Sequence, residues 1–241
     1  TCALPISEMM ALPVPLTDAE MLDRVRQTMR ASTTSTPEKY IRILLTRGVG
    51  DLSYRVDACP TPTLVIIVKP LELPPDSWVS DGIRVALVGI RRNHPQALNP
   101  MIKSNNLLNL ALAMQEAYQS GADEALMQNQ AGELVECSQS NFFMVRGGRV
   151  LTPPLTAGLL PGITREFVMA LASELKIPAA EARLTPDDLK TADEAFLTGT
   201  TRDIIPIVAV DRQMIGSGRP GPMTRQLLAA FKKKTAEMAR A

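Results

Sequence analysis

Four short apolar segments follow one another in the middle of the chain, and they limit the folds that it can adopt. They occupy residues 124–127, 134–136, 142–145 and 150–152. Apolar segments of this length, bounded by turn residues, are typical of strands rather than helices. The pair Gly147-Gly148 between the last two favours a tight hairpin turn. The sequence therefore predicts an antiparallel meander over this region.

Helices and further strands are predicted on both sides of the meander. Apolar residues at helical spacing define the helices, and runs of β-branched residues between glycines and prolines define the strands. The predicted helices cover 17–31, 104–120, 164–175 and 223–241, and the predicted strands cover 41–46, 63–68, 85–90, 194–198 and 204–210. Helices and strands mixed in this way place the chain in the α/β (α+β) class.

The segment RRNHPQALNP at 91–100 is the best candidate for a linker between two domains. It holds two prolines and two asparagines and has no apolar periodicity. Such composition is typical of a loop that connects structured regions. We therefore expect an N-terminal α/β domain at 1–90 and a C-terminal domain at 101–241.

Charge and cysteine content narrow the class of ligand and the compartment. The 26 basic residues nearly balance the 25 acidic ones, so we expect a small-molecule ligand and neither a nucleic acid nor a membrane surface. The longest apolar run, 64–68, is far shorter than the roughly 20 residues of a membrane span, and the first ten residues do not resemble a signal peptide. An odd set of cysteines, Cys2, Cys59 and Cys137, favours the cytoplasm, and with His94 as the only histidine we expect no metal site.

Two glycine-containing segments could bind a phosphate group. Gly162-Ile163-Thr164 precedes a predicted helix, where free backbone N–H groups and the helix dipole favour an anion. Thr198-Gly199-Thr200-Thr201 follows a predicted strand and offers a close backbone approach together with hydroxyl donors. Taken singly, each has an ordinary alternative, namely a helix capped by Thr164 and a polar turn.

Lys103 and Glu136 are the charged residues that complete a possible site. Lys103 is flanked by apolar residues, so its amine could be partly desolvated and form a Schiff base, although most such lysines are solvated. Glu136 ends an apolar strand and could hold a positively charged ring nitrogen, or it could simply face water. An amine, two phosphate-binding segments and a carboxylate are together what pyridoxal phosphate requires.

Four sequence strings carry a specific resemblance to a known family. They are IKSNNLLN, ELVECSQSNFF, LLPGITRE and DEAFLTGTTRDIIPI, in that order. With these strings the chain resembles the class IV (fold type IV) pyridoxal-phosphate enzymes from about Pro100 onward. That family includes branched-chain and D-amino-acid aminotransferases and aminodeoxychorismate lyase. The resemblance implies a two-domain α/β homodimer whose N-terminal domain is truncated here, since no strands and phosphate-clamping arginine precede Thr17.

The resemblance also implies a role for each matching residue. Lys103 corresponds to the Schiff-base lysine and Glu136 to the partner of the ring nitrogen. Leu160 would pack against the ring, and the turn at Thr200-Thr201 would help to hold the substrate carboxylate. The residues implied to bind the phosphate are Ile163, Thr164, Gly199 and Thr200. Tyr40 and Arg42, which alternation places on one strand face, resemble substrate residues of branched-chain aminotransferases, with an ordinary edge strand as the alternative.

These matches favour an aminotransferase that moves an amino group between a branched-chain amino acid and a 2-oxo acid such as 2-oxoglutarate. Aminodeoxychorismate lyase, which releases pyruvate and 4-aminobenzoate, is an alternative because Cys137 stands where many aminotransferases have glycine. A D-amino-acid aminotransferase is a further one, although Leu52 and Tyr54 occupy the positions of its carboxylate-binding residues unless Arg55 substitutes. The last alternative is an inactive fragment that binds the cofactor. The sequence leaves amino-acid preference and stereochemistry open.

Overall fold

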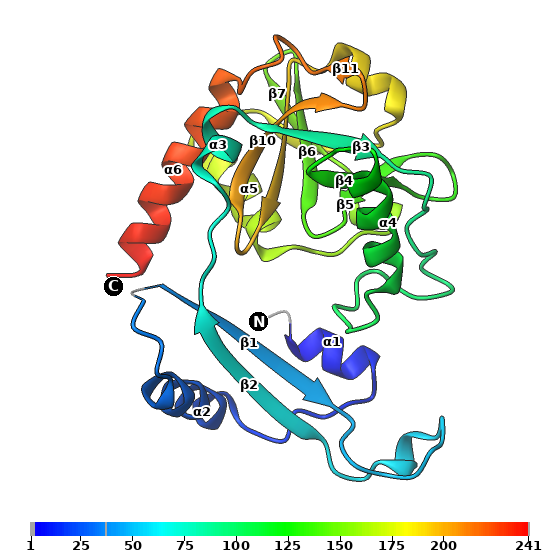
Figure 1. Cartoon of the computed structure of the whole chain (residues 1–241), viewed down its shortest axis with the longest axis vertical. Helices are drawn as coiled ribbons and strands as arrows, with labels where there is room; N and C mark the ends of the chain where they lie inside the picture. Colours follow the sequence, from blue (N-terminus) through cyan, green and yellow to red (C-terminus); the bar gives the residue numbers. More distant parts are fainter. Residues whose placement is uncertain (1–2, 37, 241) are drawn as a thin grey trace. The chain divides into compact units, whose positions relative to one another are not determined.

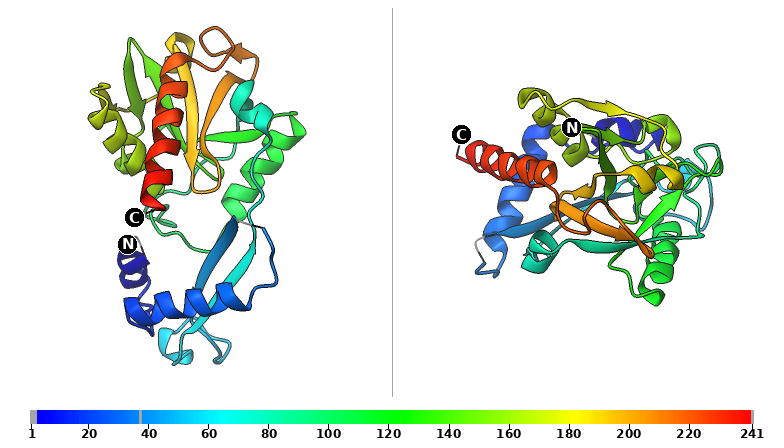
Figure 2. Two further views of the ribbon diagram at one scale, coloured as in Figure 1. Left: turned by 90° about the vertical axis from the view of Figure 1, so that its left-hand side faces the viewer. Right: turned by 90° about the horizontal axis from the view of Figure 1, so that it is seen from above.

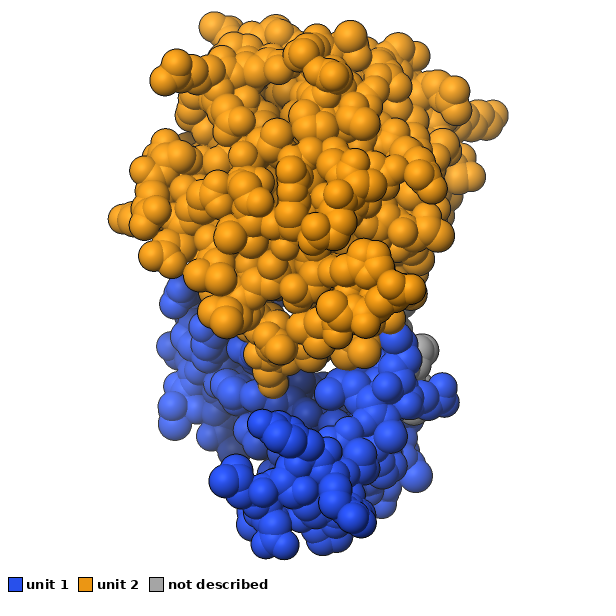
Figure 3. All heavy atoms as spheres, turned by 90° about the vertical axis from the view of Figure 1, so that its right-hand side faces the viewer, with its two compact units in different colours: residues 1–73 blue, residues 74–241 orange. Residues whose placement is uncertain are grey.

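The computed structural model describes residues 3–36 and 38–240, which form two compact units that divide between Leu73 and Pro74 (Figure 3). This division falls earlier than the predicted linker at 91–100. The strand predicted at 85–90 lies at 83–87 and pairs within the sheet of the second unit, so it does not belong to an N-terminal domain that ends at residue 90. Cys2 lies outside the described residues, and Cys59 and Cys137 are free thiols.

The first unit contains two helices and a two-stranded antiparallel sheet. They are α1 (Ala3–Met9), α2 (Asp18–Ala31), β1 (Lys39–Thr46) and β2 (Thr63–Pro70), with a short 3-10 turn at Val56–Ala58. The helix predicted at 17–31 is confirmed, and it begins after the cap residue Thr17, which exchanges hydrogen bonds with Glu20 in a capping box. Among the described side chains at 6–36 and 38–73, Leu12 is the one buried hydrophobic residue.

The second unit is built on a nine-stranded mixed sheet (Figure 1). Its strands are β3 (Ile83–Leu87), β4 (Glu124–Gln128), β5 (Leu134–Cys137), β6 (Asn141–Arg146), β7 (Arg149–Thr152), β8 (Ala179–Glu181), β9 (Glu194–Gly199), β10 (Asp203–Val210) and β11 (Gln213–Met214). The predicted meander is confirmed, since β4 to β7 pair antiparallel in sequence order. Gly147 and Gly148, both with positive φ, form the hairpin turn between β6 and β7.

The pairing within this sheet closes on itself. β9 pairs with both β6 and β10, and β10 pairs with β3, so β10, β3, β4, β5, β6 and β9 form a continuous ring of neighbours. Alternating side chains therefore enter different clusters. Phe142 and Met144 belong to one buried cluster, whereas Phe143 and Val145 belong to the cluster beneath the helices α5 (Ile163–Glu174) and α6 (Pro222–Met238).

Helices cover the sheet on more than one side (Figures 1 and 2). α5 and α6 contact β9 and each other, and α4 (Leu108–Gln119) contacts β3 and β4. A short helix, α3 (Asp76–Ser80), contacts β10 and was not predicted. In the described part of the chain, no helix has the length and the apolar character that a membrane span requires.

Candidate functional site

Lys103 lies in the loop between β3 and α4, and its side chain is exposed. The helix predicted to start at Ser104 begins at Leu108 instead, because 104–107 form tight local turns. The flanking Leu107 and Leu108 are themselves exposed, so the expectation that apolar neighbours desolvate the amine is wrong. Any special reactivity of this lysine must come from the groups that it faces and not from its immediate neighbours in sequence.

Glu136 is 5% exposed, which excludes the alternative that it faces water. It lies near the end of β5, and three groups donate hydrogen bonds to its carboxylate, two of them from distant parts of the chain. The Arg92 Nε donates to Oε1 over 2.7 Å, and the backbone N–H of Leu160 donates to Oε2 over 3.1 Å. The Asn141 side-chain amide is a longer donor to Oε2, at 3.4 Å. Glu136 is therefore a buried and oriented carboxylate.

Burial and charge act in opposite directions on this carboxyl group. Burial raises the pKa of Glu136 above its ordinary value, while the nearby Arg92 guanidinium and the Leu160 N–H lower it. The charge of Lys103 also lowers the pKa of Glu136. The charge of the exposed Lys103 amine thus favours the ionised form of the buried carboxylate.

Asn141 connects Glu136 to the turn that precedes α5. Its side-chain amide donates to the carbonyl oxygen of Leu160 over 2.9 Å. A Cβ atom added to Gly162 would lie 2.0 Å from the Asn141 Oδ1, so this position has no room for a side chain. The glycine serves close approach here and not an unusual backbone angle, since its φ is −74°. The turn is consequently fixed against the end of the sheet.

The first turn of α5 has no side-chain cap. Gly162 is the N-cap residue, and no side-chain hydrogen bond caps the helix. The alternative in which Thr164 caps α5 is therefore wrong, because Thr164 lies inside the first turn and is half-buried. Unpaired N–H groups at a helix start favour an anion. This end of α5 can bind a phosphate group beside the Glu136 carboxylate.

The second predicted phosphate segment forms the turn between β9 and β10. Gly199 pairs with Asp203 across the hairpin, and the Arg202 N–H donates to the Gly199 carbonyl oxygen. A Cβ atom added at Gly199 would lie 3.6 Å from the Gln139 carbonyl oxygen and 3.7 Å from the Ser140 Cβ. The turn therefore lies against the segment that joins Glu136 to Asn141, so the structure brings the Gly199 and Glu136 regions together.

Tyr40 and Arg42 both lie on β1 and point to one face of the two-stranded sheet, as alternation predicts. Both are half-buried. Tyr40 is paired with Lys69 in the register, and the Lys69 ammonium lies 5.3 Å from the centre of the Tyr40 ring. A charged amine over an aromatic face is a favourable arrangement. These residues belong to the first unit.

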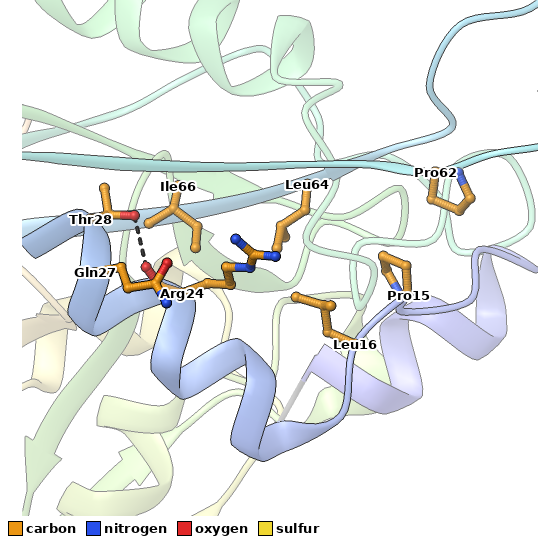
Figure 4. Close-up of a pocket in the computed structure, with 8 residues that line it drawn as sticks. All are labelled: Pro15, Leu16, Arg24, Gln27, Thr28, Pro62, Leu64 and Ile66. Carbon is orange, nitrogen blue, oxygen red and sulfur yellow. Dashed lines mark hydrogen bonds between the residues drawn. The ribbon is translucent and has the colours of Figure 1, made fainter.

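A pocket of about 440 Å³ also lies within the first unit (Figure 4). It is lined by Arg24, Gln27 and Thr28 of α2, by Leu64 and Ile66 of β2, and by Pro15, Leu16 and Pro62. None of these is a predicted site residue. Among the described residues, no group of histidine, cysteine and acidic side chains is arranged to hold a metal ion.

Comparison with known proteins shows the family. The sequence profile of the family described as amino-transferase class IV matches residues 7–210. This chain belongs to the class IV aminotransferases.

Individual class IV aminotransferases resemble it closely. A Methanocaldococcus jannaschii protein, provisionally named a branched-chain amino acid aminotransferase, is 40% identical over 92% of this chain and 76% of its own. The Escherichia coli branched-chain amino acid aminotransferase superposes with a TM-score of 0.91 at 29% identity, over 96% of this chain and 76% of that one. The Thermobaculum terrenum enzyme in its pyridoxal-phosphate form superposes with a TM-score of 0.85 at 30% identity, over 96% and 75%.

Pyridoxal 5′-phosphate is the cofactor of this family, and the residues of the site fit it. The buried carboxylate of Glu136 suits a protonated ring nitrogen. The start of α5 without a side-chain cap suits the phosphate, and Lys103 supplies an accessible amine. The hydroxyls of Ser140 and Thr198, buried beside the turn at Gly199, are without hydrogen-bond acceptors or donors among the described residues. The described residues therefore offer a carboxylate, an amine and a helix start without a side-chain cap, which are groups that pyridoxal phosphate can use.

The sequence analysis missed several residues of this region. Arg92 falls in the predicted linker at 91–100, and no motif selects Asn141, Glu124 or Arg202. Asn141 and Arg202 lie inside the matching strings, which could have drawn attention to these two, whereas Glu124 lies outside them. Arg92 lies outside these strings, and only the folded chain shows its contact with Glu136.

Proposed function

We propose that this class IV aminotransferase transfers an amino group between a branched-chain amino acid and a 2-oxo acid such as 2-oxoglutarate. The observation that carries the proposal is the buried Glu136 carboxylate, which Arg92 and the Leu160 N–H orient beside the start of α5 that has no side-chain cap. The branched-chain preference is supported by the names of the relatives and by Tyr40 and Arg42 on β1. The D-amino-acid alternative is disfavoured by Leu52 and Tyr54, which cannot bind a carboxylate through charge.

The proposal assigns chemical roles to Lys103 and Glu136. Lys103 holds the cofactor through its Nζ atom and then moves the proton of the substrate α-carbon as general base and acid. Glu136 accepts a hydrogen bond from the ring nitrogen and keeps it protonated. When bound, pyridoxal phosphate supplies an electron sink for the negative charge at the α-carbon.

The remaining residues of the proposed site hold and orient. Ile163 and Thr164 at the start of α5, together with Gly199 and Thr200, bind the phosphate. Leu160 packs against the ring. The turn at Thr200-Thr201 helps to hold the substrate carboxylate. Tyr40 and Arg42 are the candidate substrate residues of the first unit.

Replacement of the lysine tests the assignment. We expect Lys103→Ala to lower leucine/2-oxoglutarate transamination by about 10²–10⁴-fold, the range of a lost general acid-base group. Borohydride reduction of the cofactor-loaded wild-type protein should attach the cofactor to the Lys103 peptide, as seen by mass spectrometry. Lys190→Ala is the control, because Lys190 is exposed and forms its ion pair with Asp187, which is exposed as well. Unchanged activity and labelling in Lys103→Ala would refute the assignment.

Substrate assays separate the activities within the family. Transfer from leucine to 2-oxoglutarate supports the branched-chain assignment. Release of pyruvate from aminodeoxychorismate without a 2-oxo acid indicates the lyase, and turnover of D-alanine indicates the D-amino-acid enzyme. Absorbance changes on cofactor addition without any turnover indicate binding alone.

We further infer that the enzyme acts as a homodimer, as the family resemblance implies, and that it acts in the cytoplasm, which the odd set of cysteines favours. Its partners would then be a second copy of the chain, an amino acid and a 2-oxo acid. Sedimentation of the cofactor-loaded protein measures the oligomeric state, and a monomer at micromolar concentration would contradict the dimer.

A further inference from the structure

Glu124, the first residue of β4, carries a carboxylate that is 0% exposed. Its Oε1 accepts hydrogen bonds from the backbone N–H of Ala125 over 2.8 Å and from that of Ser138 over 3.1 Å. The Ser138 hydroxyl donates to the same oxygen. Its Oε2 accepts from the Nη1 of Arg202. One buried carboxylate thus binds two segments that are far apart in sequence.

These two segments are the ones that border the proposed cofactor site. Ser138 opens the connection between Glu136 and Asn141, and Arg202 belongs to the turn that holds Gly199. The two turns lie side by side, because Asn141 pairs with Thr198 where β6 meets β9, and a Cβ atom added at Gly199 would lie 3.6 Å from the Gln139 carbonyl oxygen. Glu124 links them from the side of β4, which contributes none of the predicted site residues.

The ion pair between Glu124 and Arg202 stabilises this link. A buried carboxylate is unfavourable unless an opposite charge and hydrogen bonds compensate for its lost hydration. The side chain of Arg202 is only 14% exposed, and it provides the compensating charge. Its guanidinium carbon also lies 5.5 Å from the centre of the ring of Trp78, the only tryptophan. Arg202 is therefore held between a carboxylate and an aromatic ring, and the turn that carries it has little freedom to move.

We propose that Glu124 and Arg202 are positioning residues that fix the turn at 199–202 so that it can bind the phosphate of the cofactor. The inference rests on the proposed function, because it assumes that Gly199 and Thr200 bind that phosphate. Neither Glu124 nor Arg202 needs to touch the cofactor. Loss of the link frees the turn, so phosphate binding weakens while the amine and the ring-nitrogen partner stay in place.

The comparison of two probes isolates this effect. Pyridoxal 5′-phosphate and pyridoxal share the aldehyde and the ring, and only the first has the phosphate. We expect Glu124→Gln to raise the Kd for pyridoxal 5′-phosphate by at least about tenfold, the scale of one lost charge-assisted hydrogen bond. The Kd for pyridoxal should change by less than about twofold. Arg202→Lys keeps the charge but not the planar contact with Trp78, so it should give a smaller rise in the same direction.

Glu194→Gln is the matched control. Glu194 lies at the opposite end of β9 from Gly199, is comparably buried at 8% exposure, and accepts hydrogen bonds from the backbone N–H and the hydroxyl of Thr224, each at 2.7 Å. This variant should lower the thermal midpoint of the cofactor-free protein without changing either Kd. Trp78 fluorescence of the cofactor-free protein reports whether Arg202 has moved in Glu124→Gln.

Three results would overturn the inference. The first is an unchanged Kd for pyridoxal 5′-phosphate in a folded Glu124→Gln or Arg202→Lys protein. The second is an equal rise in the Kd values for pyridoxal 5′-phosphate and pyridoxal, which would indicate general loosening of the fold. The third is a wild-type protein that binds pyridoxal 5′-phosphate no better than pyridoxal. Failure of the proposed function is distinguished separately, because it appears as loss of Lys103 labelling in the wild-type protein. If Glu124→Gln does not fold, Arg202→Lys carries the test.

Discussion

At the scale of single residues, the ion pair between Arg92 and Glu136 decides what the site can do. The two side chains are 9% and 6% exposed, and the pair is joined at 2.7 Å. Without the guanidinium, burial alone would favour the protonated form of Glu136. A protonated carboxyl group could no longer stabilise a positively charged ring nitrogen.

We expect Arg92→Met to make stability more sensitive to pH. Burial raises the pKa of Glu136 in the folded protein, so between the unfolded and folded pKa values the folded state binds more protons than the unfolded chain does. The contribution of this group to stability therefore falls as pH rises through that interval. Loss of Arg92 raises the pKa of Glu136 further, so the decrease in the free energy of unfolding continues to higher pH. At a pH where Glu136 is ionised, loss of its ion pair with Arg92 should lower the free energy of unfolding by about 3–5 kcal/mol.

Urea unfolding of both proteins from about pH 5 to about pH 8 measures this difference. Arg183→Met is the control, because Arg183 forms an ion pair with Glu133 while its side chain is 76% exposed. An ion pair exposed in this way should contribute little to the free energy of unfolding. Parallel pH profiles for wild type and Arg92→Met would show that Arg92 does not set the ionisation of Glu136.

At the scale of elements, a buried carboxylate also starts the last helix. Glu194 accepts hydrogen bonds from the N–H groups of Met223 and Thr224, which are in the first turn of α6. A Cβ at the N-cap residue Gly221 would lie 2.0 Å from the Glu194 Cδ. The string GPM at the start of α6 is therefore explained by close approach, with proline at N1 where no N–H is needed.

Gly221→Ala should destabilise the second unit by about 1–3 kcal/mol, because the added methyl group must displace the capping carboxylate. Thermal unfolding of the cofactor-free protein is the measurement. Gly89→Ala is the matched control, since its Cβ would lie 3.4 Å from the Glu116 Oε1, a much milder contact. Equal shifts of the two midpoints would show that the Glu194 contact does not limit position 221.

At the scale of the whole molecule, the two units differ in how much apolar surface they bury. The three large buried clusters lie in the second unit, whereas Leu12 is the one buried hydrophobic residue among the described side chains of the first. A two-stranded sheet has little stability of its own in water. The second unit therefore supplies most of the hydrophobic stabilisation of the chain.

Hydrogen exchange should reveal this difference directly. We expect the amides of β1 and β2 to exchange at least about a hundredfold faster than those of β9 and β10, after correction for intrinsic rates. Mass spectrometry of peptic fragments after timed labelling gives both values from one sample. Equal protection of the two pairs would contradict the inference from burial.

The sequence alone determined the local structure and the position of the chemistry. The helix that follows Thr17, the Gly147-Gly148 turn and the order of the meander strands are properties of neighbouring residues, so periodicity and turn chemistry predicted them. The four family strings selected Lys103, Glu136 and two candidate phosphate-binding turns, because their spacing along the chain is specific.

Tertiary structure decided which distant groups meet. Arg92 reaches Glu136 across 44 positions and Arg202 reaches Glu124 across 78, and no local pattern encodes such contacts. The pairing of β3 with β10 and β4 placed the strand at 83–87 in the second unit, which the linker composition at 91–100 could not indicate. The physical reason is that the partners of a buried charge and the assignment of a strand to a sheet depend on long-range packing, whereas helices and turns form from neighbours in sequence.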